Sequence, residues 1–183
     1  MSALTREKSQ LMSASEIERT LVRLAHEVLE RTQDLSKLAF IGIRRRGVPL
    51  AQRIAARIAA LEDLTIPVGI LDINLYRDDL STVDVKPVLN ATEIDFNITG
   101  KDIILFDDVL YTGRTIRAAL DALFDQGRPD RVQLCVLIDR GHRELPIEAR
   151  YVGRQVQTSD REIIEVKFRE IDEVEKVLLM ELV

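Results

Sequence analysis

Short apolar runs recur along the chain and are separated by stretches of helical periodicity. The apolar runs cover residues 38–43, 103–106 and 132–138. Runs of this length are typical of strands that are buried on both faces of a parallel sheet. Helices connect neighbouring strands in such sheets, so the pattern predicts one α/β domain over residues 1–183, with right-handed crossovers.

Three stretches have apolar residues at the spacing of an amphipathic helix. Ser13 and Glu16 have the spacing of a capping box, and the apolar stripe that follows predicts a helix to about Arg31. Two further stripes, at residues 50–61 and 116–123, predict the second and third helices.

The other segments are less regular. Residues 1–12 show no period and are expected to be irregular, whereas residues 66–76 alternate and predict a third strand. Residues 77–100 are polar and lack sustained periodicity, which favours a flexible lid loop beside a site. The remaining elements are strands expected at 151–153 and 163–168, and a strand or short helix at 170–183.

Composition and charge exclude some classes of protein. The chain is 46% hydrophobic and 31% charged, as in ordinary globular proteins, and its net charge of −5 argues against a protein that coats nucleic acid non-specifically. Cys135 is the single cysteine and lies in an apolar run, so we expect a buried thiol and no disulfide. No segment is typical of a membrane span or a signal peptide, which predicts a cytoplasmic protein without a membrane partner.

The stretch after residue 106 combines two carboxylates with a turn rich in hydroxyls and glycine. Asp107 and Asp108 follow the strand, and the turn Thr112-Gly113-Arg114-Thr115 precedes the third helix. The first amides of a helix lack intrahelical partners and lie at its positive end, where they can bind a phosphate. The two carboxylates could then accept from ribose hydroxyls or hold a Mg²⁺ that carries a diphosphate. This order predicts a site for a phosphorylated sugar at the carboxyl edge of the sheet.

Each of these motifs also has a plainer interpretation. An Asp-Asp pair after a strand is often a cap or a solvated turn, and receiver-type phosphoacceptor pockets use acidic strand ends as well. The hydroxyl-rich turn argues against both alternatives. Arg44, Arg45 and Arg46 lie between the first predicted strand and its helix, where they could be surface charge or could bind a diphosphate. The diphosphate that the acidic motif implies favours the second interpretation.

The sequence IILFDDVLYTGRT at residues 103–115 resembles the phosphoribosyl diphosphate motif of the type I phosphoribosyltransferases. The resemblance implies a five-stranded parallel sheet flanked by helices, a small hood over the base, and Mg²⁺ as cofactor. It implies that the hydroxyl-rich turn holds the 5′-phosphate and that the two aspartates hold the ribose hydroxyls and, partly through the substrate, the metal. The residues so implied are Asp107, Asp108 and Arg77 for catalysis, and Arg45, Arg46, Tyr76, Val109, Leu110, Tyr111, Thr112, Gly113, Arg114, Thr115, Arg140 and the backbone of Ile164 for substrate binding.

Other blocks narrow the resemblance to one branch. LYRDDL at 75–80 and DRGHRELPI at 139–147 are similar to bacterial regulators of pyrimidine operons that are also uracil phosphoribosyltransferases. This implies binding of uracil, phosphoribosyl diphosphate (PRPP) and uridine nucleotides (UMP and UTP), binding of pyrimidine operon leader mRNA, and a homodimer or larger homo-oligomer. Purine-using relatives carry an acidic residue where this chain has Tyr111, so the motif favours a pyrimidine substrate.

The resemblance also suggests an RNA-binding surface. Its candidate residues are Arg19, Arg23, His26, Arg143 and Arg154. The first three share a face of the first predicted helix, which by pattern alone would be an ordinary solvated face. Val22 lies on this face at a position where RNA-binding relatives carry a hydroxyl residue. The valine cannot make the polar contact with RNA that a hydroxyl would make.

Three hypotheses about function therefore remain open at the level of sequence. The chain could be a bifunctional regulator and enzyme, a plain uracil salvage enzyme, or a catalytically weak UMP and PRPP sensor that does not bind RNA. The enzyme requires intact aspartates and the phosphate turn, whereas the regulator requires the arginine surface.

Overall fold

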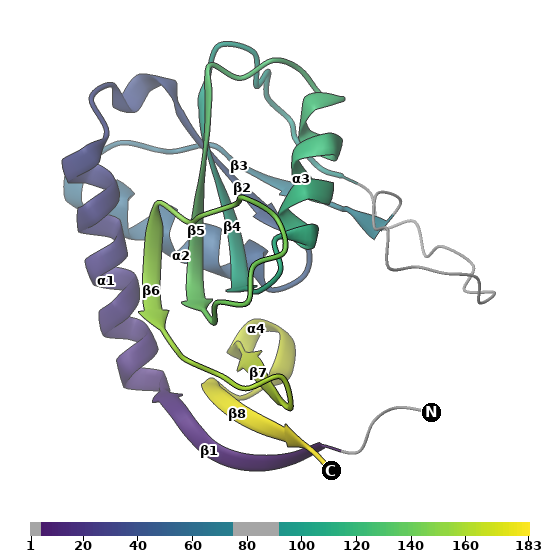
Figure 1. The fold of residues 1–183 in the computed structure, drawn as a ribbon. Helices are drawn as coiled ribbons and strands as arrows, with labels where there is room; N and C mark the ends of the chain where they lie inside the picture. The colour runs from purple at the N-terminus through teal and green to yellow at the C-terminus, as the bar shows by residue number, and fades with distance from the viewer. Residues whose placement is uncertain (1–4, 75–91) are drawn as a thin grey trace.

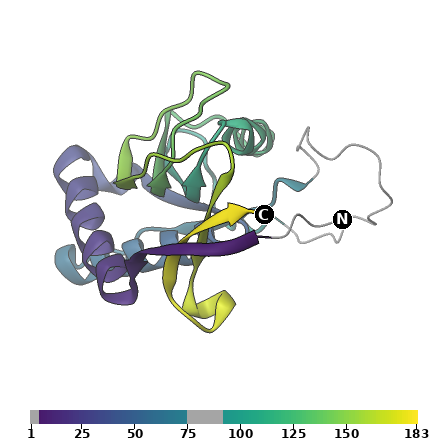
Figure 2. The same cartoon turned by 60° about the horizontal axis from the view of Figure 1, so that its bottom comes forward.

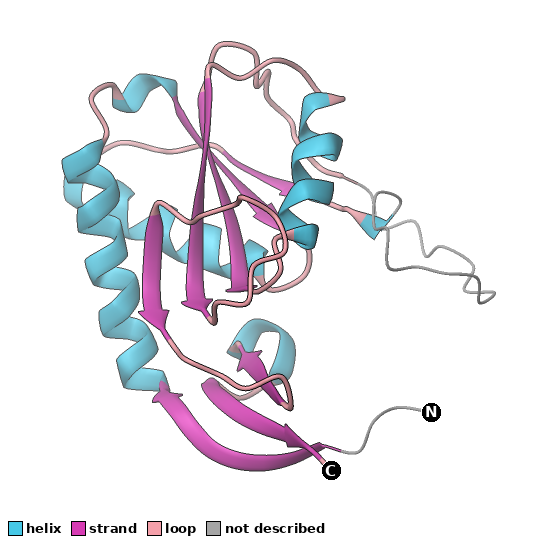
Figure 3. Ribbon diagram, viewed as in Figure 1, coloured by secondary structure: helices cyan, strands magenta, loops and turns pink. Residues whose placement is uncertain are grey.

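The computed structural model describes residues 5–74 and 92–183, and its centre is a parallel sheet of five strands in the order β3-β2-β4-β5-β6 (Figure 1). The arrows of β4, β5 and β6 all point toward a smaller second sheet (Figure 3). The expected sheet is confirmed. Its strands are β2 (Leu38–Ile43), β3 (Val68–Leu71), β4 (Asp102–Leu110), β5 (Arg131–Asp139) and β6 (Tyr151–Gln155).

Helices cover both faces of the sheet, which explains the apolar runs. Ile104 and Phe106 of β4 pack in the core with α1 (Ala14–Arg31) and α2 (Gly47–Glu62), and the alternate residue Leu105 packs in the core with α3 (Arg114–Phe124). Cys135 has no exposed surface and burial raises the pKa of its thiol, so the expected core position is confirmed. No helix in the described ranges is both long and apolar enough to cross a membrane.

Most predicted helix ends are confirmed. Ser13 and Glu16 form the expected capping box at the start of α1, which ends at Arg31. The apolar stripe of α2 stops one turn earlier than predicted, because Leu61 is 50% exposed. A single 3₁₀ turn, η1 (Leu35–Lys37), joins α1 to β2.

A second, antiparallel sheet forms a hood at the carboxyl edge of the parallel sheet. Its strand order is β1-β8-β7, and β1 and β8 lie side by side in two views (Figure 1 and Figure 2). The elements of this hood are β1 (Thr5–Ser13), β7 (Glu162–Lys167), α4 (Arg169–Asp172) and β8 (Lys176–Leu182).

Two predictions for the chain ends need correction. Residues 1–12 were expected to be irregular, but those from Thr5 onward form β1, because backbone pairing with β8 replaces the missing apolar period. Residues 170–183 were expected to be a strand or a short helix. They contain both, since α4 ends at Asp172, Glu173 adopts a left-handed conformation, and β8 follows.

The third strand is shorter than the predicted 66–76. It ends at Leu71, because the carboxylate of Asp72 accepts a hydrogen bond from the Asn74 amide at 2.9 Å and turns the chain. After the undescribed segment, Glu93 bridges Ile70, and Ile98 is buried. The greater part of the predicted lid, with Tyr76 and Arg77, lies outside the described residues.

Candidate active site at the carboxyl edge of the sheet

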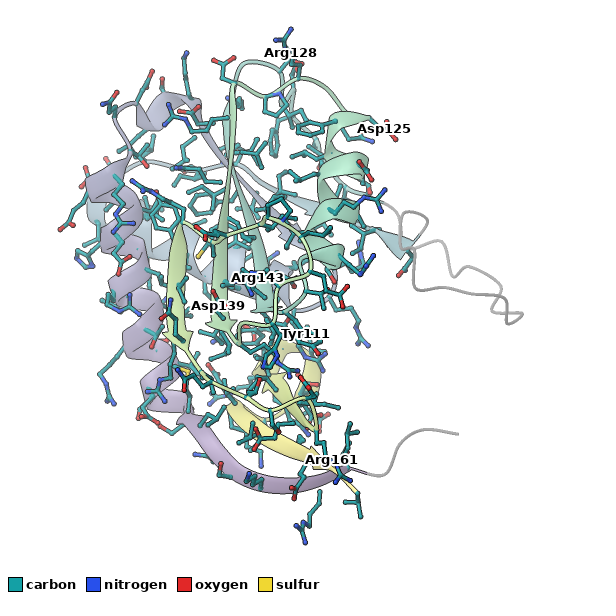
Figure 4. All side chains as sticks on the ribbon, in the orientation of Figure 1. Tyr111, Asp125, Arg128, Asp139, Arg143 and Arg161 are labelled. Carbon is teal, nitrogen blue, oxygen red and sulfur yellow. The ribbon has the colours of Figure 1, made fainter. Side chains whose placement is uncertain are left out.

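The sequence-predicted residues gather where the parallel strands face the hood. Figure 4 shows Tyr111, Asp139 and Arg143 at this edge, whereas Asp125 and Arg128 lie at the opposite end of the sheet. The carboxyl edge of a parallel sheet is where open α/β folds bind ligands.

The two aspartates lie within β4, since this strand continues beyond the predicted end at Phe106 to Leu110. Asp107 is only 7% exposed, and its Oδ1 accepts the Asp108 amide at 3.0 Å. The Oδ1 of Asp108 accepts the Val109 amide at 2.9 Å. Burial raises the pKa of Asp108, although the hydrogen bond with Asp107 opposes this shift. A cation or hydroxyl donors that reach the carboxylate of Asp108 would therefore stabilise its charged form.

The turn after β4 has the geometry of a phosphate site. Gly113 is the N-cap of α3, with φ of 93°, a conformation that side chains strongly disfavour. The Thr112 hydroxyl accepts the Arg114 amide at 3.3 Å and so supports the first turn. The next amides, beginning with that of Thr115, are those that a helix leaves without intrahelical acceptors. Backbone donors, two hydroxyls and a guanidinium thus surround the start of α3.

The loop at 139–147 is joined to this turn. The Thr112 carbonyl accepts the amides of Glu144 and Leu145 at 2.9 and 3.2 Å, and Arg114 Nε donates to Glu144 at 2.5 Å. Sequence reasoning did not assign a site role to Glu144, because its partner lies thirty residues earlier in the chain. The loop thereby fixes the position of the phosphate turn.

The arginine loop approaches the same edge from the neighbouring strand β2. A Cβ on Gly47 would lie 2.1 Å from the Phe106 carbonyl oxygen, so only glycine permits this close packing just before the aspartates. Arg45 is exposed. Arg46 donates to Asp172 of α4 through Nη2 at 2.7 Å and Nε at 3.3 Å.

The ion pair between Arg46 and Asp172 shifts the pKa of both residues. The hydrogen bond to Asp172 raises the pKa of Arg46, and the charge of Asp108 adds to this effect. Burial alone would raise the pKa of Asp172, but Arg46 and the Phe168 amide outweigh it, so the pKa is lowered. Asp172 was not predicted as a site residue, because nothing local in the sequence links it to Arg46, 126 residues away.

Arg140 defines the far end of the site. It is 6% exposed, donates to the Thr158 hydroxyl at 3.0 Å and the Ser159 carbonyl at 3.3 Å, and stacks on Tyr111. Its own amide donates to the carbonyl of Leu110 at 3.1 Å. Ile164 is buried in β7, opposite Leu179 of β8. The structure thus brings Arg140 to the motif, while Ile164 belongs to the hood.

The candidate RNA residues have different surroundings. Arg19 and His26 are exposed on α1, and Arg23 donates to the carbonyls of β6 at Val152 and Gly153. Arg154 hydrogen-bonds to the Leu11 carbonyl and lies 3.4 Å from Glu16.

Arg143 is held within its own loop. Its guanidinium donates to Asp139 at 2.6 Å, to the Ile147 carbonyl at 2.8 Å and to the Tyr111 carbonyl at 2.9 Å. The structure therefore gives Arg143 a part in shaping the loop beside Tyr111.

Comparison with known proteins agrees with this geometry. A family model of the phosphoribosyl transferase domain matches residues 8–170. The "Bifunctional protein PyrR" of Pelotomaculum thermopropionicum is 56% identical over 178 residues, which cover 97% of this chain and 98% of that protein. The chain belongs to the phosphoribosyltransferase family, in its PyrR branch. The PyrR of Thermus aquaticus is 55% identical over 174 residues, which cover 95% of this chain and 96% of that protein.

Solved phosphoribosyltransferases with low identity share the fold. A hypoxanthine-guanine phosphoribosyltransferase of Bacillus anthracis aligns with a TM-score of 0.70 at 20% identity and covers 97% of this chain and 99% of its own. The hypoxanthine phosphoribosyltransferase of Trypanosoma cruzi aligns with a TM-score of 0.68 at 12% identity, covering 97% and 98%. These identities support the fold only. The expected fold class and family are confirmed.

Proposed function

We propose that this PyrR-family chain transfers the phosphoribosyl group of PRPP to uracil, giving UMP and diphosphate, and that it regulates pyrimidine genes by binding their leader mRNA. The observation that carries the enzymatic part is the β4–α3 junction, where Asp107 and Asp108 stand next to the Gly113 turn. The similarity to bifunctional PyrR proteins over nearly the whole chain supports the regulatory part.

The proposal assigns a role to each site residue. The turn 112–115 binds the 5′-phosphate, and the two aspartates accept from the ribose hydroxyls. The arginines at 45 and 46 bind the diphosphate, while Arg140 and the backbone of Ile164 face uracil. A lid that begins at Tyr76 and Arg77 excludes water during the reaction. The end of the range predicted for this lid, residues 93–98, packs against the sheet and is left out of the proposal.

The carboxylates fit a Mg²⁺ ion that arrives with the substrate. No group of three or more His, Cys, Asp or Glu side chains able to hold a metal occurs among the described residues. Mg²⁺ often takes one or two carboxylates and completes its shell with water and substrate phosphates, so Asp107 and Asp108 suffice together with PRPP. When bound, the ion supplies positive charge that stabilises the departing diphosphate.

The chemistry is a displacement at the anomeric carbon of ribose. The bond from this carbon to the diphosphate oxygen breaks, a bond to the uracil nitrogen forms, and uracil loses the proton of that nitrogen. Positive charge builds on the ribose ring as the bond to diphosphate breaks, and the neighbouring aspartates stabilise it. Positioning of both substrates by the turn and by Arg140 supplies the rest of the acceleration.

RNA binding uses the exposed face of α1. Arg19 and His26 are exposed there, and guanidinium groups suit phosphate and base-edge contacts. Self-association into a dimer or larger homo-oligomer would join two such faces. A cytoplasmic location fits both the RNA partner and the buried reduced Cys135.

Two measurements test the proposal. Purified protein should form UMP from uracil, PRPP and Mg²⁺, and a silent sensor would bind UMP in calorimetry without forming product. In gel shifts, the organism's own pyrimidine leader RNA should bind more tightly than a scrambled RNA, and more tightly still with UMP. Product formation with equal affinity for both RNAs would reduce the function to uracil salvage.

A further inference from the structure

The diphosphate arginine is already paired with a carboxylate of the hood. Arg46 donates two hydrogen bonds to Asp172, at 2.7 and 3.3 Å. The pair is partly shielded from solvent, since the side chains are 30% and 16% exposed. Asp172 also accepts the Phe168 amide at 2.9 Å, so the carboxylate is fixed to the backbone at the start of α4.

The carboxylate of Asp172 occupies Arg46 as a phosphate of the expected diphosphate would. The guanidinium fork of arginine binds two oxygens of a carboxylate or of a phosphate in the same bidentate way. Asp172 takes the Nε and Nη2 edge of Arg46, so a diphosphate that used this edge would have to displace it. A fixed negative charge at this place also repels the ligand.

We propose that Asp172 competes with the diphosphate group for Arg46, so that the arginine exchanges the hood for the ligand when PRPP binds and returns to the hood when diphosphate leaves. The inference rests on the proposed function, in which Arg46 is a diphosphate ligand. The competitor weakens the binding of the leaving group and thereby favours its release.

A neighbouring ion pair shows what a purely structural contact looks like. Arg53 of α2 pairs with two hood carboxylates, Glu170 at 2.7 Å and Glu175 at 2.5 Å, and its side chain is 18% exposed. Arg53 lies two helical turns beyond Arg46 and is not part of the predicted diphosphate loop. Glu170 is on the same short helix as Asp172, so its substitution is a matched control for the loss of one hood carboxylate.

Asp172 also links Arg46 to the strand β7 of the hood. Asp172 anchors the Phe168 amide, and Phe168 directly follows β7, the strand that contains Ile164. Arg46, Asp172 and the end of β7 are thus joined by consecutive hydrogen bonds.

The test is calorimetric titration with magnesium diphosphate, followed separately from UMP formation. Asp172→Asn keeps an oxygen for the Phe168 amide and removes the charge. The dissociation constant of this variant for magnesium diphosphate should therefore be about fivefold lower than that of the wild type, a change of the size expected for one modest ion pair. Glu170→Gln should stay close to the wild-type affinity. In an Arg46→Gln background, Asp172→Asn should bring no gain, because the two residues act through each other.

Three results would overturn the inference: an unchanged or weaker affinity in Asp172→Asn, an equal gain in Glu170→Gln, or a gain that persists without Arg46. Absence of binding in both wild type and Asp172→Asn would overturn it as well. If Asp172→Asn does not fold, Asp172→Ser retains a side-chain oxygen for the same comparison. A wild-type protein that binds diphosphate as expected but forms no UMP would instead refute the proposed enzyme alone.

Discussion

The guanidinium of Arg140 lies 3.9 Å from the centroid of the Tyr111 ring. Its hydrogen-bond partners Thr158 and Ser159 are neutral, so the aromatic face is what stabilises the charge of this buried arginine. Tyr111 occupies the motif position where purine-using relatives carry an acid. The tyrosine thus orients Arg140 without neutralising it, which would leave the charge available to a pyrimidine carbonyl in the proposed uracil site.

Replacement of the ring should weaken uracil binding. Tyr111→Leu removes a cation–π contact between a buried arginine and a partly exposed ring, which is worth about 1 kcal/mol. The KM for uracil should therefore rise about fivefold while the KM for PRPP changes little. Tyr111→Phe keeps the ring and is the control. Steady-state kinetics with each substrate varied in turn would measure the effect, and equal rises in both KM values would contradict it.

Asp108→Asn should separate activity from stability. Loss of the charged acceptor for ribose or Mg²⁺ should lower kcat/KM by about 100-fold or more. The fold should not suffer, because burial raises the pKa of Asp108 and so disfavours its charged form in the folded chain relative to the unfolded chain. UMP formation and urea denaturation of the same preparations would measure both effects.

The pH dependence of this variant has a defined sign. A carboxyl whose pKa is raised on folding favours the folded state at pH values below its unfolded pKa, and this stability is lost as pH rises through the folded pKa. Asp108→Asn should therefore be more stable than wild type at pH 7, with the difference shrinking toward pH 4. A variant that is less stable than wild type at pH 7 would show that the charge supports the fold.

The link between β1 and β7 should be sensitive to acid. The hydrogen bond from Lys8, at 2.6 Å, and that from the Ser159 amide lower the pKa of Glu162 to about 2. A lowered pKa gives stability above the unfolded pKa, which is lost as pH falls through the folded value. Glu162→Gln should thus be less stable than wild type at pH 7, and the two should converge between pH 4.5 and pH 2. Urea denaturation at several pH values would check this, and a constant difference would contradict it.

Gly113→Ala should damage the phosphate turn more than the fold. At φ of 93° an alanine is strained, and its Cβ would contact Leu145 and Ile147 at 3.4 Å. The KM for PRPP should rise about tenfold or more, since relief of this strain moves the amides at the start of α3. Gly100→Ala is a control with positive φ and open space around it, far from the motif. Equal kinetic effects of the two changes would contradict the role given to the turn.

The sequence predicts the parallel sheet well because each strand carries its own signal. The run at 132–138 becomes β5 and that at 38–43 becomes β2, since burial on both faces selects apolar residues at 38–43 and at 134–138. The capping box at Ser13 is equally local, and it marks the start of α1 correctly. The order of Asp107, Asp108 and the Gly113 turn is local too, which is why it pointed to one edge of the sheet.

What the sequence could not predict depends on pairing over distance. Residues 5–10 of β1 are exposed and polar, and they form a strand only because β8 supplies hydrogen bonds. Arg46 pairs with Asp172, and Arg140 stacks on Tyr111. Both contacts join segments that are distant in the sequence and meet only in the folded chain. Positions of chemical groups were therefore predictable, but their partners were not.

The hood combines strands that lie far apart in the sequence, since β1 pairs along its length with β8. During synthesis on a ribosome, the parallel sheet can form before β1 has its partner strand, and the hood is completed only after residues 176–182 emerge. A nascent or prematurely terminated chain would then present an unpaired strand edge, a natural target for chaperones. Uracil transfer would begin only once translation has passed β8.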